Sequence, residues 1–170
     1  IRNEYDIENN KGDVLYGMIV QLQHVATGLF LAGLRTSSLD SDCFQLKIEA
    51  GSANCYFKIA PMYKIRTEGS HVVSDDEILF GSLSIAKHFV HKSSRVRPNL
   101  TSHGVLYDEC NLSRSSAFSK MSLKIFSRTV PYKSKTLCTT QATRFLDCES
   151  NAFLRASCDL RMRENENREA

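Results

Sequence analysis

The sequence MIVQLQHVATGLFLA, residues 18–32, contains two short apolar runs separated by a turn-like Ala26-Thr27. Apolar and polar residues alternate over the second half of the first run, up to His24. An alternation with a period of two residues is typical of a half-buried β-strand. We therefore expect two strands joined by a short turn, with His24 hydrogen-bonded to that turn.

Short apolar runs of the same kind recur along the chain, separated by clusters of Ser, Gly, Asn and Asp. This spacing favours an all-β sandwich or barrel over a fold with crossover helices. The further strands that we expect are 43–48, 55–59, 77–80, 87–91, 105–107, 121–126, 137–140, 144–148 and 153–156. Only the two ends, 1–10 and 159–170, look helical or loose, because they are rich in Glu, Asn and Arg.

The apolar runs also repeat along the chain. Residues 19–32 align with 78–91 at a shift of 59 (78 − 19), and Phe145 aligns with Phe30 at a shift of 115 (145 − 30). Three related units of several strands each make up a β-trefoil, and closing a barrel removes exposed sheet edges. The third unit begins at Thr136 and lacks a convincing closing strand. The predicted fold is therefore an all-β, β-trefoil fold that is incomplete.

Composition excludes some classes of function. Of 170 residues, 42% are hydrophobic and 24% are charged, which is near the average for a globular domain with a packed core. The net charge of +3 is too small to predict a nucleic-acid partner. No run approaches the roughly 20 apolar residues of a membrane helix, so we expect no direct membrane insertion by this segment.

Six cysteines occur at irregular spacings, without the C-x-x-C pairs of common zinc sites. Reduced thiols and disulfides are both compatible with the even count. We favour reduced thiols, because a chain of this length can build a core without disulfides. The triplets Asn99-Leu100-Thr101 and Asn111-Leu112-Ser113 would be glycosylation sites in a lumenal protein.

Few residues suggest catalysis or metal binding. His88 and His91 would point to opposite faces of a strand, and no third ligand has a suitable spacing, so we expect no metal site. Asp75-Asp76-Glu77 is a carboxylate cluster of the kind used in acid–base catalysis, but a charged turn before a strand explains it better. The common motifs for a nucleophile, a phosphate loop or a zinc helix are absent. We therefore predict neither enzymatic activity nor a cofactor.

Residues 16–24 together with Leu29-Phe30-Leu31 resemble the strand–turn–strand signature of MIR repeats. These repeats occur in protein O-mannosyltransferases, inositol trisphosphate receptors and ryanodine receptors. The more specific stretch is 55–72, CYFKIAPMYKIRTEGSHV, which is similar to the Pro-x-Tyr-Lys-x-Arg-Ser-x-Gly segment of the calcium-release channels. The resemblance covers about residues 1–155 and is closer to inositol trisphosphate receptors, chiefly through Tyr63-Lys64.

This resemblance implies three parts of the chain. They are an arm remnant or linker (1–17), suppressor-type β-trefoil units (18–130) and the start of the following β-trefoil (131–170). In the family, the loop that matches 61–70 lies between neighbouring subunits and couples ligand binding to gating.

The resemblance therefore implies interface roles for Tyr63, Lys64 and Arg66. A tyrosine suits such a contact because it is large and amphipathic, and the two cations would add electrostatic steering. Without the resemblance, a basic turn would be the simpler explanation of these residues.

The second trefoil of the family binds phosphate through an Arg-Thr-Thr-Gly-Arg run. The matching residues here are Arg155-Ala156-Ser157-Cys158-Asp159, which implies ligand-binding roles for Arg155 and Ser157. Asp159 would repel a phosphate. We expect inositol trisphosphate to bind only in the complete binding region, and not to this chain alone.

The resemblance implies a non-enzymatic regulatory segment of a tetrameric calcium-release channel, on the cytosolic face of the endoplasmic reticulum membrane. Its partners would be neighbouring subunits and the rest of the same channel, with no nucleic acid. The alternative is a lumenal MIR β-trefoil that binds sugar or protein, in an O-mannosyltransferase-like or quality-control protein. A small trefoil lectin is disfavoured because the sequence has no Trp.

Overall fold

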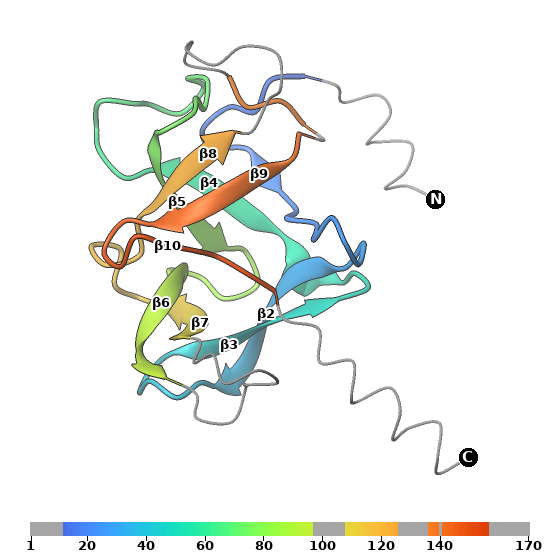
Figure 1. The fold of residues 1–170 in the computed structure, drawn as a ribbon, viewed down its shortest axis with the longest axis vertical. Helices are drawn as coiled ribbons and strands as arrows, with labels where there is room; N and C mark the ends of the chain where they lie inside the picture. Colours follow the sequence, from blue (N-terminus) through green and yellow to red (C-terminus); the bar gives the residue numbers. More distant parts are fainter. Residues whose placement is uncertain (1–11, 97–107, 126–135, 140, 157–170) are drawn as a thin grey trace.

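The computed structural model describes residues 12–96, 108–125, 136–139 and 141–156 (Figure 1). Within them it has a sheet of ten β-strands and one 3₁₀ helix, η1 (Ala53–Cys55). The strands are β1 (Ile19–Val20), β2 (Phe30–Ser37), β3 (Phe44–Glu49), β4 (Phe57–Pro61), β5 (Glu77–Ser82), β6 (Phe89–Val96), β7 (Asp108–Ser113), β8 (Met121–Ile125), β9 (Thr143–Asp147) and β10 (Ala152–Phe153). No helix in this part of the chain is long and apolar enough to cross a membrane.

Alternating burial explains why the apolar runs form strands. In β4, Phe57 and Ile59 are buried, while Lys58 between them is only partly buried. This is the period of two residues that places successive side chains on opposite faces of a sheet. The apolar side of each strand therefore contributes to one shared core.

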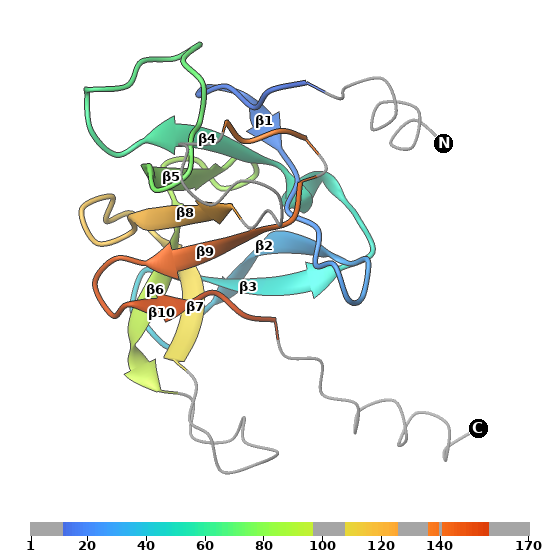
Figure 2. The ribbon, with the colours of Figure 1, turned by 45° about the horizontal axis from the view of Figure 1, so that its top comes forward.

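The strands form a single antiparallel sheet with a branched order (Figure 2). One line of neighbours runs β1–β4–β5–β8–β9. The hairpins β2–β3 and β6–β7 pair with each other through β3 and β7, and β10 pairs with β9. In β5, Gly81 pairs with both Lys58 and Phe89, so β4 and β6 lie on opposite edges of β5. Ile78 likewise pairs with β4 and β8.

Three chain segments meet in a closed ring of backbone hydrogen bonds. The N–H of Val14 donates to the carbonyl of Leu137 (2.7 Å), Leu137 donates to Val72 (2.7 Å), and Val72 donates to Val14 (3.0 Å). Each segment also bridges the next, at Leu15 with His71, at Val73 with Thr136, and at Asp13 with Cys138. The ring marks a pseudo-threefold axis, which relates three units as in a β-trefoil.

The register of the repeat differs from the predicted one. The ring relates Val72 to Val14 by 58 residues (72 − 14) and Leu137 to Val14 by 123 (137 − 14), where we predicted 59 and 115. Phe145 therefore corresponds to Phe80 in the first strand of a unit, and its match with Phe30 was wrong. The reason is that Phe30 and Phe145 each stand beside a leucine, so the local pattern alone does not show which strand of its unit each one belongs to.

The third segment shares the core of the first two. Fully buried residues from β4, β5 and β8 form its centre, and Leu137 and Phe145 pack against it. The rings of Phe80 and Phe145 contact each other edge to face, with centroids 4.9 Å apart. The predicted domain boundary at 130/131 lies outside the described residues and stays a prediction.

Most of the predicted strands coincide with observed ones, with three differences. The predicted strand 105–107 lies outside the described residues, while β7 was not predicted because its sequence, DECNLS, is mostly polar. Residues 136 and 138 form isolated bridges in place of the predicted strand 137–140. Within the described residues, the third unit contributes β9 and β10.

Candidate interaction surface

A loop of residues 62–70 follows β4 and is held at both ends by backbone hydrogen bonds. At its start, the N–H of Met62 donates to the carbonyl of Glu77 (3.1 Å). At its end, Gly69 donates to Tyr16 and Tyr16 donates to Ser70, both at 2.9 Å. Gly69 has φ +88°, a conformation that favours glycine. The 62–70 loop is therefore anchored to the first ring segment as well as to β5.

Asp76 connects this loop to the core. Its Oδ2 atom accepts hydrogen bonds from the hydroxyl of Tyr16 (2.8 Å) and from the N–H of Val73 (3.1 Å). Its Oδ1 atom lies 3.3 Å from the guanidinium of Arg66, and its side chain is only 14% exposed. Burial, followed by the bond to Asp76, raises the pKa of Tyr16 far above its ordinary value.

The carboxylate cluster thus has the structural role predicted for it. Asp75 takes a positive φ of 70° in the turn before β5 and pairs with Lys124, and Asp76 holds the loop. A residue in this left-handed conformation is common at tight turns, where Asp is better tolerated than most residues. Two carboxylates with such different partners are not arranged as an acid–base pair.

The outer side of the loop presents apolar and cationic groups together. Tyr63 is 48% exposed and Ile65 is 88% exposed. Lys64 and Arg66 alternate with them and are exposed as well. The structure therefore places the three predicted interface residues on one anchored loop, and adds Ile65, which the resemblance did not single out.

A shallow hollow of about 160 Å³ lies beside this loop, lined by Tyr16, Pro61, Tyr63, Ile65, Arg66, Asp76 and Glu77. Small-molecule sites usually have volumes of roughly 300–1,000 Å³. The hollow is therefore the size of a single protein side chain, and it suits a protein contact better than a bound metabolite.

Lys120, just before β8, extends the cationic side of this surface. The charge of Glu77, followed by the charge and hydrogen bond of Tyr63, raises the pKa of Lys120. The amine also lies 3.8 Å from the carboxylate of Glu149. Tyr63 of the loop therefore lies beside a residue from the second unit.

The predicted ligand residues are only partly visible. Arg155 is exposed and follows β10, in the third unit. Ser157 lies outside the described residues. The structure does not bring Arg155 onto the 62–70 loop, and the role of both residues in phosphate binding stays a prediction.

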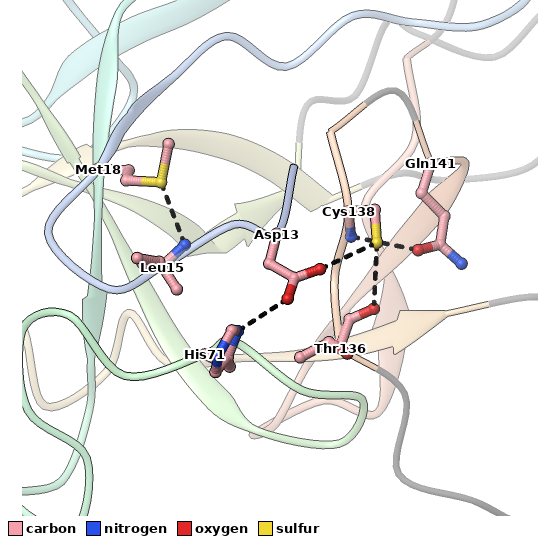
Figure 3. A network of polar contacts seen from close by, with 7 residues as sticks. All are labelled: Asp13, Leu15, Met18, His71, Thr136, Cys138 and Gln141. Atoms are coloured by element: carbon pink, nitrogen blue, oxygen red, sulfur yellow. Dashed lines mark hydrogen bonds and ion pairs between the residues drawn. The ribbon is translucent and has the colours of Figure 1, made fainter. Parts of the chain in front are cut away.

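Asp13, His71 and Cys138, which are next in sequence to the members of the backbone ring, form a second polar cluster (Figure 3). Asp13 lies between two partners, with Oδ2 at 3.1 Å from His71 Nδ1 and Oδ1 at 3.4 Å from Cys138 Sγ. Burial, followed by the bond to Asp13, raises the pKa of Cys138, so the thiol stays protonated and is a poor nucleophile. The arrangement supports a structural role in joining the units.

The sequence pattern did not predict this cluster, because its three members are far apart in the chain. Asp13 and His71 occupy matching places, directly before Val14 and Val72, whereas Cys138 follows Leu137, so the repeat register relates only the first two. No group of three or more metal-binding side chains is present in the described residues.

The histidines also bond within the fold. His24 Nδ1 lies 2.8 Å from the hydroxyl of Thr27, which confirms the predicted bond to the turn. His88 is buried and bonds to the carbonyl of Ala86 (2.8 Å). His91 Nδ1 lies 2.9 Å from Oδ1 of Asn111.

Asn111 is buried between the hairpins β2–β3 and β6–β7 and is hydrogen-bonded to both sides. Its Nδ2 donates to Asp40 (2.8 Å) and Ser38 (3.2 Å), and the residue has no exposed surface. An amide in these bonds is not accessible to a glycosyltransferase, so the triplet at Asn111 is not a glycosylation site in the folded chain. The triplet at Asn99 lies outside the described residues.

The five described cysteines, Cys43, Cys55, Cys110, Cys138 and Cys148, are free thiols.

Solved structures with the same architecture define the class of the fold as an all-β, MIR-type β-trefoil. The SDF2-like protein from Arabidopsis thaliana has a TM-score of 0.70 and 18% identity, over 89% of this chain and 83% of that one. A Caenorhabditis elegans protein of unknown function has a TM-score of 0.69 and 13% identity, over 84% and 78%. The Saccharomyces cerevisiae protein O-mannosyltransferase Pmt1-Pmt2 complex bound to the sugar donor has 0.66 and 13%, over 84% of this chain and 20% of that one. At these identities the likeness shows the fold alone.

Within this class, the sequence identifies a particular family. The family described as inositol 1,4,5-trisphosphate/ryanodine receptor matches residues 3–122, which is more than half of the chain. The chain therefore belongs to the inositol 1,4,5-trisphosphate/ryanodine receptor family. No curated protein gives a significant match to this sequence.

Proposed function

We propose that this chain is a non-catalytic regulatory segment of an intracellular ligand-gated calcium-release channel, at the cytosolic face of the endoplasmic reticulum membrane. The 62–70 loop contacts a neighbouring subunit of a tetramer and couples ligand binding to gating. Inositol trisphosphate binds only to the complete binding region, to which this segment contributes Arg155 and Ser157.

One observation carries the proposal, namely the anchored loop with exposed apolar side chains. Exposed apolar groups on a loop held by Tyr16 and Asp76 need little ordering when a partner binds, which favours affinity. Tyr63 and Ile65 supply apolar area, and Lys64 and Arg66 attract a partner with acidic groups. Family membership supports a subunit contact as the use of this surface.

Photo-crosslinking tests this proposal directly. A photoreactive amino acid replaces Ile65 in the chain, which is expressed in cells that contain calcium-release channels. Val25 is a matched control, because it is 83% exposed against 88% for Ile65 and lies on a different turn. We expect adducts with a channel subunit from position 65 and few from position 25. Equal adducts from both positions, or adducts without a channel subunit, contradict the proposed contact.

The lumenal alternative is favoured by the likeness to the SDF2-like protein and to the O-mannosyltransferase complex. It requires passage through the secretory pathway, where Asn99 would be glycosylated. Treating the expressed chain with a glycosidase and comparing its mass with an Asn99→Gln variant separates the two functions. An unchanged mass supports the cytosolic proposal, and a loss of mass that needs Asn99 supports the lumenal one.

A further inference from the structure

Thr67 is an exposed threonine on the 62–70 loop, and two cations precede it closely. Lys64 lies three residues before it and Arg66 one residue before it, and both are exposed as well. Protein kinases choose their substrates partly by charge pattern, and those with an acidic substrate groove select basic side chains just before the hydroxyl. The hydroxyl of Thr67 is therefore presented together with the charges that such an enzyme recognises.

The backbone of residues 63–68 forms turns of its own. The N–H of Arg66 donates to the carbonyl of Tyr63 (3.4 Å), and that of Ser70 donates to Thr67 (3.1 Å). Among the described residues, no backbone hydrogen bond joins 63–68 to another element, because the anchors lie at the two ends of the loop. The hydroxyl of Thr67 lies 3.2 Å from that of Ser70, in an exposed contact. An enzyme can therefore draw out the middle of the loop without breaking strand pairing, and such local opening needs little free energy.

Two other hydroxyls with a cation shortly before them are held inside the fold. Ser38 lies three residues after Arg35, but it is partly buried and accepts a hydrogen bond from Asn111 (3.2 Å). Ser93 directly follows a lysine and has no exposed surface. The structure therefore favours Thr67 over both as a target for an enzyme.

A phosphate on Thr67 reverses the charge of the loop. Residues 62–70 contain two cations and one carboxylate, Glu68, which gives a net charge of +1. A phosphothreonine adds about −1.5 to −2 at pH 7, so the net charge becomes about −0.5 to −1. Its oxygens also compete for Arg66 with Asp76, which lies 3.3 Å from the guanidinium. The modified loop repels the acidic groups that the unmodified loop attracts.

We propose that Thr67 is a phosphorylation site for a serine/threonine kinase that selects basic residues, and that its phosphate releases the loop from its partner. The release rests on the proposed contact with a neighbouring subunit, whereas the modification does not. The kinase transfers the γ-phosphoryl group of ATP to Oγ1 of Thr67, so a new O–P bond replaces the bond between that phosphorus and the leaving ADP. The hydroxyl proton passes to the catalytic base of the kinase. The reaction takes place on subunits whose loop is not yet in contact with a partner.

Phosphorylation of the folded full chain tests the site. The probes are ATP with the catalytic domains of protein kinases A and C, which select basic residues, and casein kinase II, which selects acidic residues, is the control enzyme. Peptide mapping by mass spectrometry should place the phosphate of the first two enzymes on Thr67. Thr36 is the matched residue, because it is exposed and follows an arginine but lies in β2 with Gly33 three residues before it. We expect about tenfold less phosphate there.

A pair of lysine variants tests recognition by charge. Lys64→Gln should slow the labelling of Thr67 about tenfold, because it removes a charged contact with the kinase. Lys47→Gln, a change of the same kind on β3, should leave the rate unchanged. No phosphate on Thr67, equal labelling by casein kinase II, or as much phosphate on the buried Ser93 as on Thr67 would overturn the assignment of the site.

Photo-crosslinking from position 65 measures the release separately. The phosphorylated chain should give about tenfold fewer adducts than the unmodified chain, and kinase-treated Thr67→Ala should give as many as the unmodified chain. Undiminished adducts from the phosphorylated chain would overturn the release. An absence of adducts from the unmodified chain would contradict the proposed contact and the release together, and the peptide map alone would then decide the modification.

Discussion

Replacing Tyr16 with phenylalanine removes one hydroxyl from the link between the 62–70 loop and the core. The ring of Tyr16 is only 2% exposed, and it remains in place in the variant. The change therefore removes the 2.8 Å bond to Asp76 with little loss of apolar packing.

The expected loss of stability in the Tyr16→Phe variant depends on the other partners of Asp76. A hydrogen bond to a charged group contributes roughly 1.5–3 kcal/mol to stability. The carboxylate keeps the N–H of Val73 and the guanidinium of Arg66, and part of it reaches water. We therefore expect the lower end of the range, a decrease of about 1.5 kcal/mol in the free energy of unfolding.

The pH dependence has a definite sign. Burial and Asp76 raise the pKa of Tyr16 in the folded chain, while in the unfolded chain it ionises near the ordinary value of about 10. Above that pH the folded state binds more protons than the unfolded state, so stability decreases as pH rises. The stability of the phenylalanine variant should fall less over the same range, and the difference between the two proteins should shrink above about pH 10.

Urea unfolding followed by circular dichroism measures both effects. Tyr56→Phe is the matched control, because Tyr56 is partly buried and should change stability by less than about 0.5 kcal/mol. A Tyr16→Phe variant as stable as the Tyr56→Phe variant would show that the bond to Asp76 does not hold the loop. A constant difference between wild type and Tyr16→Phe up to high pH would contradict the assigned pKa direction.

Two further substitutions and one chemical modification test the core. Gly33→Ala would place a Cβ atom 2.5 Å from Leu112 Cδ1, so we expect a loss of about 1–3 kcal/mol in urea unfolding, and no loss would contradict this close approach. Leu123→Ala removes a fully buried side chain next to the third unit and should cost about 2–5 kcal/mol, whereas a loss below 1 kcal/mol would place Leu123 outside the core. Burial raises the pKa of Cys110 to about 11, so iodoacetamide at neutral pH should modify it more slowly than the exposed Cys138, as mass spectrometry of timed samples will show. Equal rates for the two thiols would contradict the raised pKa of the partly buried Cys110.

The strands with clear alternation could be predicted from sequence, and those stabilised by polar contacts could not. β3 and β8 have apolar residues at every second position, and both were expected near their observed bounds. β7 contains Asn111, whose burial depends on His91, Ser38 and Asp40. Those partners come from other strands and turns, so local sequence does not indicate them.

The residues of the candidate surface were predicted, whereas the contacts that anchor its loop were not. Tyr63, Lys64 and Arg66 were named through the family resemblance, and the charged turn at Asp75 could be read from sequence. The bond between Tyr16 and Asp76 joins residues 60 positions apart, and no local pattern predicts such a contact. The third repeat was aligned with the wrong strand for a related reason. The strands that pair with β9 depend on the whole fold, and the residues next to β9 in the sequence do not indicate them.

The ring of Val14, Val72 and Leu137 also decides when the fold can be completed. Its members are 58 and 65 residues apart (72 − 14 and 137 − 72), so each bond closes a long loop. Because Leu137 supplies both an acceptor and a donor, the junction cannot form during synthesis until that residue has left the ribosome. A chain cut at residue 122, where the family match ends, would leave the N–H of Val14 and the carbonyl of Val72 without these partners. The third unit, which is synthesised last, therefore completes the hydrogen bonds that join the first two units.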